Sequence, residues 1–279
     1  MIGTLRISER EFEKFSDLVY RRAGINLHQG KKQLVQARLG KIIRHHGLSS
    51  FRDYYEEVLT DDSGDKLCEL LDRISTNHTY FFREHNHLHQ LTNTILPEIV
   101  SLEGVRKSNE LRLWSAGCST GEEPYSIAIH LLEYGRLPAD MRVRILATDL
   151  SKSVIAIADR GIYRDEKLTN VPPHLRRKYF QKGRGSWTGY YRVDKTIRSL
   201  ITFRKFNLIE TFPFRGQFEV IFCRNVMIYF DKQVQQEVVN KFFQVVKPGG
   251  YFVVGHSESL SGIQHHFKYI APTIYKRPL

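Results

Sequence analysis

Long apolar segments and secretion signals are missing from this chain of 279 residues. No run of 18 or more apolar residues occurs, which excludes a helix that spans a membrane. The first residues, MIGTLRISEREFEKF, contain no apolar stretch like that of a signal peptide. We therefore expect a protein that is not inserted in a membrane.

Cysteine is scarce. The three cysteines, Cys68, Cys118 and Cys223, are widely separated and form no CxxC pair. This spacing excludes a disulfide framework and fits a reducing compartment. We expect a cytoplasmic protein and, because no feature calls for an oligomer, a monomer.

Acidic residues are outnumbered by basic ones. The chain has 42 Lys and Arg against 30 Asp and Glu, a net charge of +12 and a pI of about 9.6. Such a balance suggests an anionic partner, which is a nucleic acid, a membrane surface or an acidic protein. The 41% hydrophobic content is sufficient for a buried core.

The first 84 residues are predicted to be helical. Ser8 and Glu11 form a capping box, and apolar residues follow at helical spacing up to Gly24. A second helix is expected over residues 31–46, and two further apolar patterns complete a small bundle.

The second helix has a basic face, because no acidic residue lies between His28 and His46. The face consists of Lys31, Lys32, Arg38, Lys41 and Arg44. For an isolated basic helix a solvated face is the commoner explanation, and docking of an acidic partner is the alternative.

From Leu111 onward, short apolar runs alternate with helical stretches. This alternation predicts an α/β fold, a doubly wound Rossmann-like domain with helices on both faces of a parallel sheet. Residues 183–206 are rich in Gly, Tyr, Val, Ile and Thr, and we expect them to form a small antiparallel β-subdomain inserted at the sheet edge. The predicted division is a helical domain with linker at residues 1–84 and an α/β domain at residues 85–279.

The segment LRLWSAGCSTGEEPYSIA, residues 111–128, has the pattern of a strand, a loop of small residues and a helix. Small residues such as Ala116 and Gly117 let a ligand approach the backbone. The segment is not GxGxxG, and Glu122 and Glu123 at the helix start would repel a pyrophosphate. They suit a cation, such as the amino group or sulfonium of S-adenosylmethionine (SAM). The alternative is a tight turn whose acids favour the helix dipole.

Asp149 follows the next predicted strand in ILATDLS. A carboxylate at that place can accept hydrogen bonds from both ribose hydroxyls of a nucleoside. A plain helix cap formed with Ser151 is the alternative. Together with the glycine loop, Asp149 favours a nucleoside cofactor.

Histidines cluster in REHNHLHQ, where His85 and His89 are one helical turn apart and His87 lies between them. No cysteine or acid partner in HExxH form accompanies them. We expect packing or solvated histidines and no metal site.

One further segment connects the two regions: ISTNHTYFFREHNHL, residues 74–88. Together with WSAGCSTGEEPYS, ATDLS and IFCRNVMIYF, it closely resembles the CheR family of chemotaxis-receptor glutamate O-methyltransferases. The resemblance covers essentially the whole chain, with the motifs in family order and spacing. It implies an enzyme that transfers the methyl group of SAM to glutamate carboxylates of chemoreceptors for sensory adaptation and leaves S-adenosylhomocysteine.

The resemblance also implies the site residues. The expected cofactor contacts are Asn77, Thr79, Arg83, Ala116, Gly117, Glu123, Asp149, Asn207, Leu208, Arg224 and Asn225. Arg83 and Tyr229 are the expected catalytic residues, with Tyr229 beside the transferred methyl. Which of Glu122 and Glu123 contacts the cofactor stays open.

The implied partners are acidic receptor helices, which would dock on the basic face of the bundle. In some members of the family the β-subdomain also binds a receptor tail peptide. Two alternatives compete with this interpretation. A nucleic-acid methyltransferase fits the basic charge, but the NPPY-type or DPPY-type string of such enzymes is replaced here by Cys223–Arg224–Asn225–Val226, so no nucleic acid is expected. A non-catalytic SAM-binding module would lack Arg83 or Tyr229, and both are present.

Overall fold

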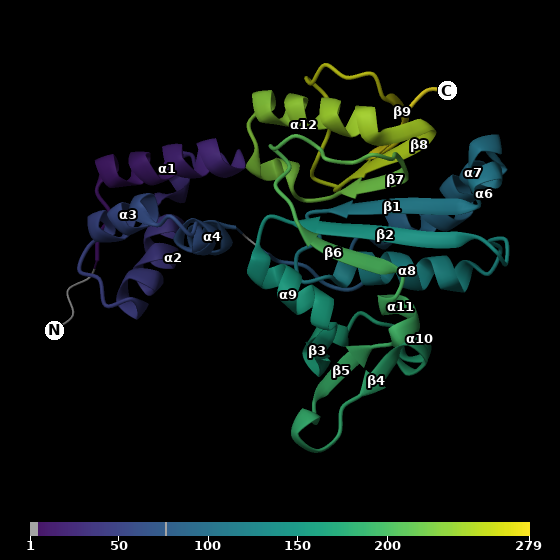
Figure 1. Ribbon diagram of the computed structural model, residues 1–279, viewed down its shortest axis with the longest axis horizontal. Helices are drawn as coiled ribbons and strands as arrows, with labels where there is room; N and C mark the ends of the chain where they lie inside the picture. The colour runs from purple at the N-terminus through teal and green to yellow at the C-terminus, as the bar shows by residue number, and fades with distance from the viewer. Residues whose placement is uncertain (1–4, 76) are drawn as a thin grey trace.

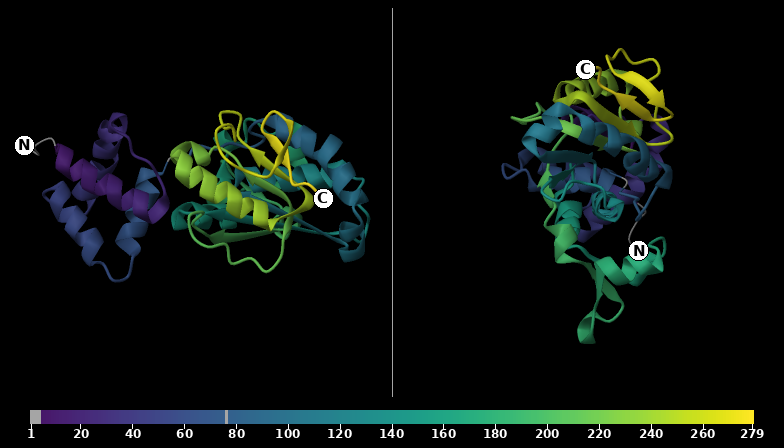
Figure 2. Two further views of the ribbon diagram at one scale, coloured as in Figure 1. Left: turned by 90° about the horizontal axis from the view of Figure 1, so that it is seen from above. Right: turned by 90° about the vertical axis from the view of Figure 1, so that its right-hand side faces the viewer.

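The computed structural model describes residues 5–75 and 77–279. Figure 1 shows a helical bundle beside a large sheet with its helices, and a small sheet that projects from the larger domain. The two views of Figure 2 show the same arrangement from above and from the side. None of the described helices is long and apolar enough to cross a membrane.

Four helices of the described chain form the bundle. They are α1 (Glu9–Ala23), α2 (Lys32–His45), α3 (Phe51–Thr60) and α4 (Asp65–Ile74), with the 3-10 turn η1 (Gln29–Lys31) before α2. The predicted capping box is confirmed, because the Ser8 side chain accepts from the backbone of Glu11 and the Glu11 side chain accepts from that of Ser8. Helix α1 ends at Gly24 in the left-handed conformation, as predicted.

Seven strands form the large sheet, in the order β6-β2-β1-β7-β8-β10-β9. Their bounds are β1 (Glu110–Ala116), β2 (Arg142–Asp149), β6 (Ile201–Lys205), β7 (Phe218–Cys223), β8 (Val246–Val254), β9 (Lys268–Ala271) and β10 (Ile274–Lys276). Strands β6, β2, β1, β7 and β8 run parallel, and the β9–β10 hairpin closes one edge. Strand β2 pairs with one side of β1, and β7 pairs with the other side, so the strand order reverses at β1. Ligands bind at such a switch point, outside the carboxyl ends of the strands.

Helices cover both faces of the sheet, because apolar side chains of β1 point to both faces and have to be buried on each. Leu113 belongs to the core on one face and Trp114 to the core on the other. The first face is covered by α5 (His85–Gln90), the π-helical turn η2 (Leu91–Ile95), α6 (Leu96–Ser101), α7 (Glu103–Ser108), α8 (Glu122–Tyr134) and α9 (Lys152–Arg160). Helix α12 (Lys232–Val245) covers the second. The doubly wound α/β fold is therefore confirmed.

The small antiparallel sheet is also present, but its predicted extent of residues 183–206 was wrong. It has the order β3-β5-β4, from β3 (Ile162–Arg164), β4 (Phe180–Lys182) and β5 (Tyr190–Val193). Around these strands lie η3 (Asp165–Leu168), α10 (Pro173–Tyr179), η4 (Gly185–Trp187) and α11 (Lys195–Arg198). Strand β6 instead pairs in parallel with β2. Its buried Ile201 and Phe203 alternate with exposed residues, a pattern that fits an edge strand in either sheet.

His130 of α8 is half-buried at the packing of α5 on α8. Its ring lies 5.5 Å from that of Phe82, 5.8 Å from that of His85 and 6.4 Å from that of His89. Burial and the neighbouring His85 and His89 lower the pKa of His130 from 6.5 to about 4. The folded protein therefore holds this imidazole neutral at a pH where the unfolded chain protonates it.

We expect this histidine to make the protein acid-sensitive. The stability that depends on neutral His130 is complete above the unfolded pKa of 6.5 and is lost as the pH falls toward about 4. After a discount for partial exposure the loss is about 2 kcal/mol. Urea unfolding at the two pH values should show this loss in the free energy of unfolding for the wild type and a much smaller loss for H130Q. The exposed control H45Q should match the wild type, and an equal acid slope in H130Q would contradict the assignment.

Candidate functional site

A pocket that is partly open to solvent lies between the bundle and the switch point of the sheet. Its position, at the carboxyl ends of the parallel strands and next to a second domain, is where small ligands usually bind. The predicted residues that line it are Asn77, Thr79, Arg83, Gly117, Glu123, Asp149, Asn207, Leu208, Arg224, Asn225 and Tyr229. The structure thus brings together side chains from the linker, from the ends of β1, β2 and β7, and from the loop after β6.

Ala116 is the exception among the predicted cofactor contacts. It is fully buried in the core beneath α12 and does not line the pocket. The reason is the alternation of the strand, since Ala116 points to the same face of β1 as Trp114.

The glycine loop after β1 is tied to the end of β2. The backbone N–H of Gly117 donates to the Thr148 carbonyl at 2.7 Å. Gly117 has a φ of +84°, and a Cβ at this position would lie 2.2 Å from Cγ2 of Val226. Only glycine fits a turn this close to the neighbouring chain.

Asp149 is half-buried at the end of β2. Its carboxylate accepts backbone N–H groups from Ser119 at 2.8 Å and from Ser151 at 3.0 Å, on different oxygens. Burial raises the pKa of Asp149, and these two hydrogen bonds oppose the rise. Ser151 itself caps α9 through its side chain. Each oxygen of Asp149 accepts one of the two backbone bonds and so has a lone pair left for a ligand.

Only one of the two glutamates at the start of α8 faces the pocket. Glu122 is fully buried, accepts from the Thr120 hydroxyl at 2.6 Å and lies 3.4 Å from Nζ of Lys167. Glu123 lines the pocket and accepts from the Ser115 hydroxyl at 2.7 Å. Successive helix residues point about 100° apart, which separates the two side chains.

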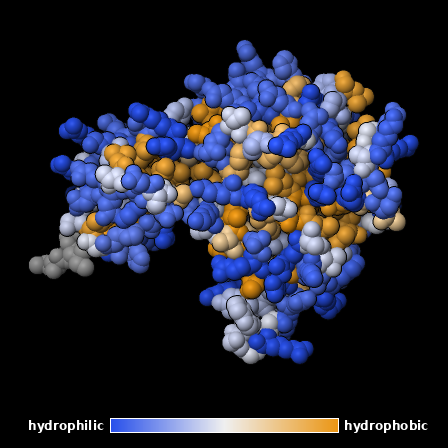
Figure 3. Space-filling view, viewed as in Figure 1, coloured by the Kyte–Doolittle hydropathy of each residue, from blue (hydrophilic) through white to orange (hydrophobic). Residues whose placement is uncertain are grey.

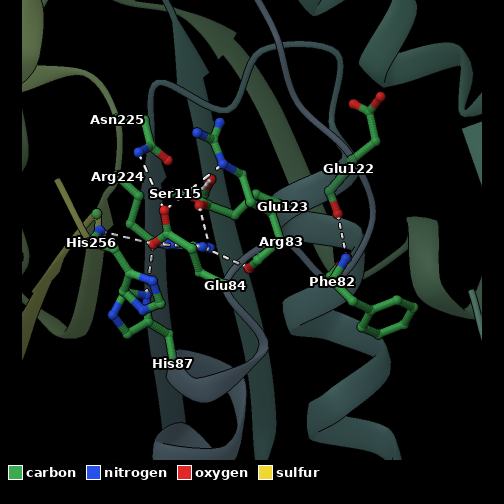
Figure 4. Close-up of polar contacts among 12 residues, drawn as sticks. Phe82, Arg83, Glu84, His87, Ser115, Glu122, Glu123, Arg224, Asn225 and His256 are labelled. Carbon is green, nitrogen blue, oxygen red and sulfur yellow. Dashed lines mark hydrogen bonds and ion pairs between the residues drawn. The ribbon is translucent and has the colours of Figure 1, made fainter. Parts of the chain in front are cut away.

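Arg224 lies at the end of β7 between two carboxylates (Figure 4), and its side chain is only 2% exposed. It donates to Glu123 at 3.0 Å, to Glu84 at 3.3 Å and to the carbonyl of Arg83 at 2.6 Å. Of the two acids, Glu123 lines the pocket, and its carboxylate suits a cationic ligand. Sequence reasoning did not identify Glu84, because nothing in FFRE shows where its side chain points.

Backbone strain gathers around the pocket. Phe82, Glu84 and Ser119 have a positive φ although they are neither glycine nor asparagine. Each such residue costs about 1–2 kcal/mol, and residues of this kind cluster at functional sites. The backbone of Phe82 is held by a 2.9 Å hydrogen bond from its N–H to the Ser126 hydroxyl.

The bundle closes one side of the pocket. The N–H of Asn26 donates to the Tyr229 carbonyl at 2.8 Å, and the Asn207 amide donates to the Arg22 carbonyl at 2.7 Å. Two expected site residues are therefore bonded directly to the bundle, at the end of α1 and just after it. The shape of the pocket depends on both domains.

The predicted basic face of α2 is only partly free. Lys31, Lys41 and Arg44 are exposed. Lys32 pairs with Glu9. Arg38 donates to the carbonyls of Ile74 and Ser75, where it caps the end of α4 next to the linker. None of the five basic residues lines the pocket.

Within the described residues, one cluster has ligand atoms close enough for a metal ion. It consists of Glu84, His87 and His256. Nη2 of Arg224 lies 3.1 Å from the same Glu84 carboxylate. A metal ion would have to compete with this fixed positive charge, so the cluster gives no support for a metal centre.

The comparisons with known proteins decide the family. The CheR methyltransferase all-alpha domain matches residues 10–75, and the CheR methyltransferase SAM-binding domain matches residues 77–276. The chain belongs to the CheR methyltransferase family. It is an S-adenosylmethionine-dependent methyltransferase with SAM as its cofactor, as the sequence predicted.

Similar proteins share nearly the whole chain. The chemotaxis protein methyltransferase of Borreliella burgdorferi is 40% identical over 275 residues, which cover 98% of this chain and 96% of that protein. That of Escherichia coli K12 is 36% identical over 277 residues, 99% of this chain and 93% of that protein. Among solved structures, the methyltransferase domain of bacterial CtHen1-C has a TM-score of 0.32 and 13% identity, covering 60% of this chain and 65% of that one. A likeness of that size carries no weight here.

Proposed function

We propose that the protein methylates glutamate side chains of chemoreceptors and forms glutamate methyl esters. The observation that carries the proposal is the pocket at the switch point, where the expected cofactor residues of the family converge. The relatives named as chemotaxis protein methyltransferases support the choice of substrate.

The pocket residues fit SAM by their chemistry. Asp149 has free lone pairs for the ribose hydroxyls, and Glu123 is an acid for the amino group of the methionine part. We assign Asn207 and Leu208 to the adenine. We assign the other expected cofactor contacts that line the pocket to the methionine end: Asn77, Thr79, Arg83, Gly117, Arg224 and Asn225.

Methyl transfer to a carboxylate needs no general base, because a glutamate with a pKa near 4.3 is ionised at neutral pH. The bound cofactor supplies the activated methyl group. The protein has to align the carboxylate and exclude water, and alignment of this kind contributes roughly 7–11 kcal/mol. The reacting charges neutralise each other, so a site with little water favours the transition state over the charged reactants.

Arg83 and Tyr229 would position the reacting groups. The Arg83 guanidinium donates to the His78 carbonyl at 3.0 Å and lies 5.8 Å from the centre of the Tyr80 ring. A tight grip on the substrate carboxylate would stabilise the ground state more than the transition state, so we assign Arg83 an orienting role. We expect R83A to lower kcat about 10- to 100-fold, as misplaced groups do. An unchanged rate of methyl transfer would remove this role.

The exposed cations of α2 are proposed to dock the acidic receptor helix. Figure 3 shows a largely hydrophilic bundle and a hollow between it and the projecting small sheet. Reversing two exposed charges, in K41E/R44E, is expected to raise the KM for receptor about tenfold and to leave SAM affinity unchanged. The control R106E/K107E reverses two exposed charges on α7, at the far end of the molecule (Figure 1). Equal KM values for both variants would contradict docking on α2.

The small sheet is proposed to bind a receptor tail peptide. A groove there combines the apolar side chains of Leu168, Val171, Phe180 and Tyr191 with Arg176, Arg177 and Lys182. In residues 162–198 basic side chains outnumber acidic ones by ten to three, which favours an acidic peptide. Titration of receptor-tail peptides against the wild type and R177E/K182E tests this, and equal affinities would reject the groove.

The reaction itself is tested with tritiated SAM and membranes that hold chemoreceptors from the same organism. Label on receptor bands that mild base releases as methanol is the expected result, because esters are base-labile. Base-stable label, or label on nucleic acid, would overturn the proposed function.

A further inference from the structure

Glu84 stands directly before α5, and its carboxylate contacts donors from several segments of the chain (Figure 4). Its side chain is 11% exposed. One oxygen lies 3.1 Å from Nη2 of Arg224 and accepts the backbone N–H of His256 at 3.1 Å. The other accepts from the side-chain amide of Asn225 at 3.3 Å. Both partner side chains, Arg224 and Asn225, line the cofactor pocket.

The same guanidinium connects Glu84 to the pocket. Arg224 uses Nη1 for Glu123 at 3.0 Å, and Nε and Nη2 face Glu84. The three side chains form a row from the linker through the end of β7 to the start of α8. Glu84 does not line the pocket itself, so it acts on the cofactor through its partners Arg224 and Asn225, and of these two Arg224 donates to Glu123.

We propose that Glu84 is a positioning residue for cofactor binding. Glu84 pairs with Arg224, so that the guanidinium is divided between Glu84 and Glu123, and it fixes the orientation of the Arg224 side chain. Glu123 can then keep its carboxylate toward the amino group of SAM. Without Glu84 the guanidinium would pair with Glu123 alone and reduce the negative charge that the cofactor meets. The inference rests on the role proposed above for Glu123.

The electrostatics around Glu84 agree with this role. Burial alone would raise the pKa of Glu84, but the His87 ring, whose Nδ1 lies 3.3 Å from the carboxylate, and the charges of Arg224 and His256 outweigh it and hold the pKa well below its ordinary range. Arg83 adds a further cation 3.9 Å away. The surrounding cations therefore favour the ionised form of Glu84.

The backbone supports the same conclusion. Glu84 has a φ of +51° and a ψ of +56°, a conformation in which glycine or asparagine is usual. The bonds from Arg224, Asn225 and the His256 backbone hold the side chain of a residue whose backbone is strained. Strain that persists next to a ligand pocket is a sign of pre-organisation.

The test measures SAM and S-adenosylhomocysteine binding by calorimetry on the full chain. E84Q keeps the shape and removes the charge, and we expect both ligands to bind at least tenfold more weakly. The matched control is E98Q. Glu98 is also a carboxylate with a lowered pKa, bonded to Tyr251 at 2.6 Å and paired with Lys276, but it lies outside the pocket. E98Q should bind both ligands like the wild type, and an E84Q that also does so would overturn the proposal.

A double-mutant cycle separates positioning from a general contribution to the fold. If Glu84 acts through Glu123, the loss in E84Q/E123Q should be at least threefold smaller than the product of the two single losses. Independent losses that multiply would overturn the proposal. If circular dichroism shows that E84Q does not fold, E84D replaces it in the same cycle, because it keeps the charge and only withdraws the carboxylate. No receptor is present, so failure of this proposal is distinguishable from failure of the methyl-ester assay.

Discussion

Replacing Asp149 by asparagine is expected to weaken SAM binding about 100-fold. Asp149 is the acid that the fold places at the end of β2, and its oxygens retain lone pairs for the two ribose hydroxyls. A hydrogen bond to a charged group contributes about 1.5–3 kcal/mol. Asparagine keeps one acceptor oxygen but loses the charge and the second acceptor, and a loss of about 2.7 kcal/mol corresponds to a factor of 100.

Calorimetry with SAM checks the expected result for D149N. The control is D159N on the exposed side of α9, which should bind SAM like the wild type. Because Asp149 also accepts the backbone N–H groups of Ser119 and Ser151, thermal unfolding of each variant without ligand is measured in parallel. A D149N protein that is folded and binds SAM within threefold of the wild type would show that this carboxylate does not hold the ribose.

Local sequence signals were sufficient for the ends of the first bundle helix. Ser8 and Glu11 satisfy each other's backbone groups, and Gly24 takes the left-handed conformation that ends α1. Such signals depend on interactions within a few residues, so they can be read from the sequence without knowledge of the tertiary structure.

The convergence of the site was also predictable. Gly117, Asp149 and Asn225 each lie at or just after the end of a strand, and the carboxyl ends of parallel strands meet at one edge. The direction of single side chains was not. The side chain of Ala116 points into the core, and that of Glu122 points into the interior of its own domain. In a strand or a helix, a shift of one position changes the face on which a side chain lies.

Contacts between distant segments were beyond the sequence. Arg38 was predicted to face solvent or a receptor, yet it caps the end of α4. Glu84 reaches Arg224 across 140 positions of the chain. Strand β6 joined the large sheet although its composition fits the small one equally well. In each case the partner is set by the tertiary fold and leaves no periodic trace in the sequence.

Replacing Gly117 by alanine is expected to destabilise the protein by about 2–5 kcal/mol and to abolish measurable SAM binding. The left-handed backbone accounts for about 1–2 kcal/mol of this cost. The new Cβ, 2.2 Å from Cγ2 of Val226, adds about 1–3 kcal/mol of overpacking. Val226 has little freedom to turn aside, because a β-branched side chain is stiff at χ1.

Two further variants separate these causes in urea unfolding. Gly189 has the same φ of +84°, and a Cβ at that position would have no atom within 4 Å, so G189A measures the backbone cost alone. The double variant G117A/V226A removes the atom that the new methyl would strike. It should recover the packing part of the loss, measured against V226A, and retain the cost seen in G189A. If G117A is no less stable than G189A, the loop has room to move, and the close approach of the chain to Gly117 is not what shapes the cofactor pocket.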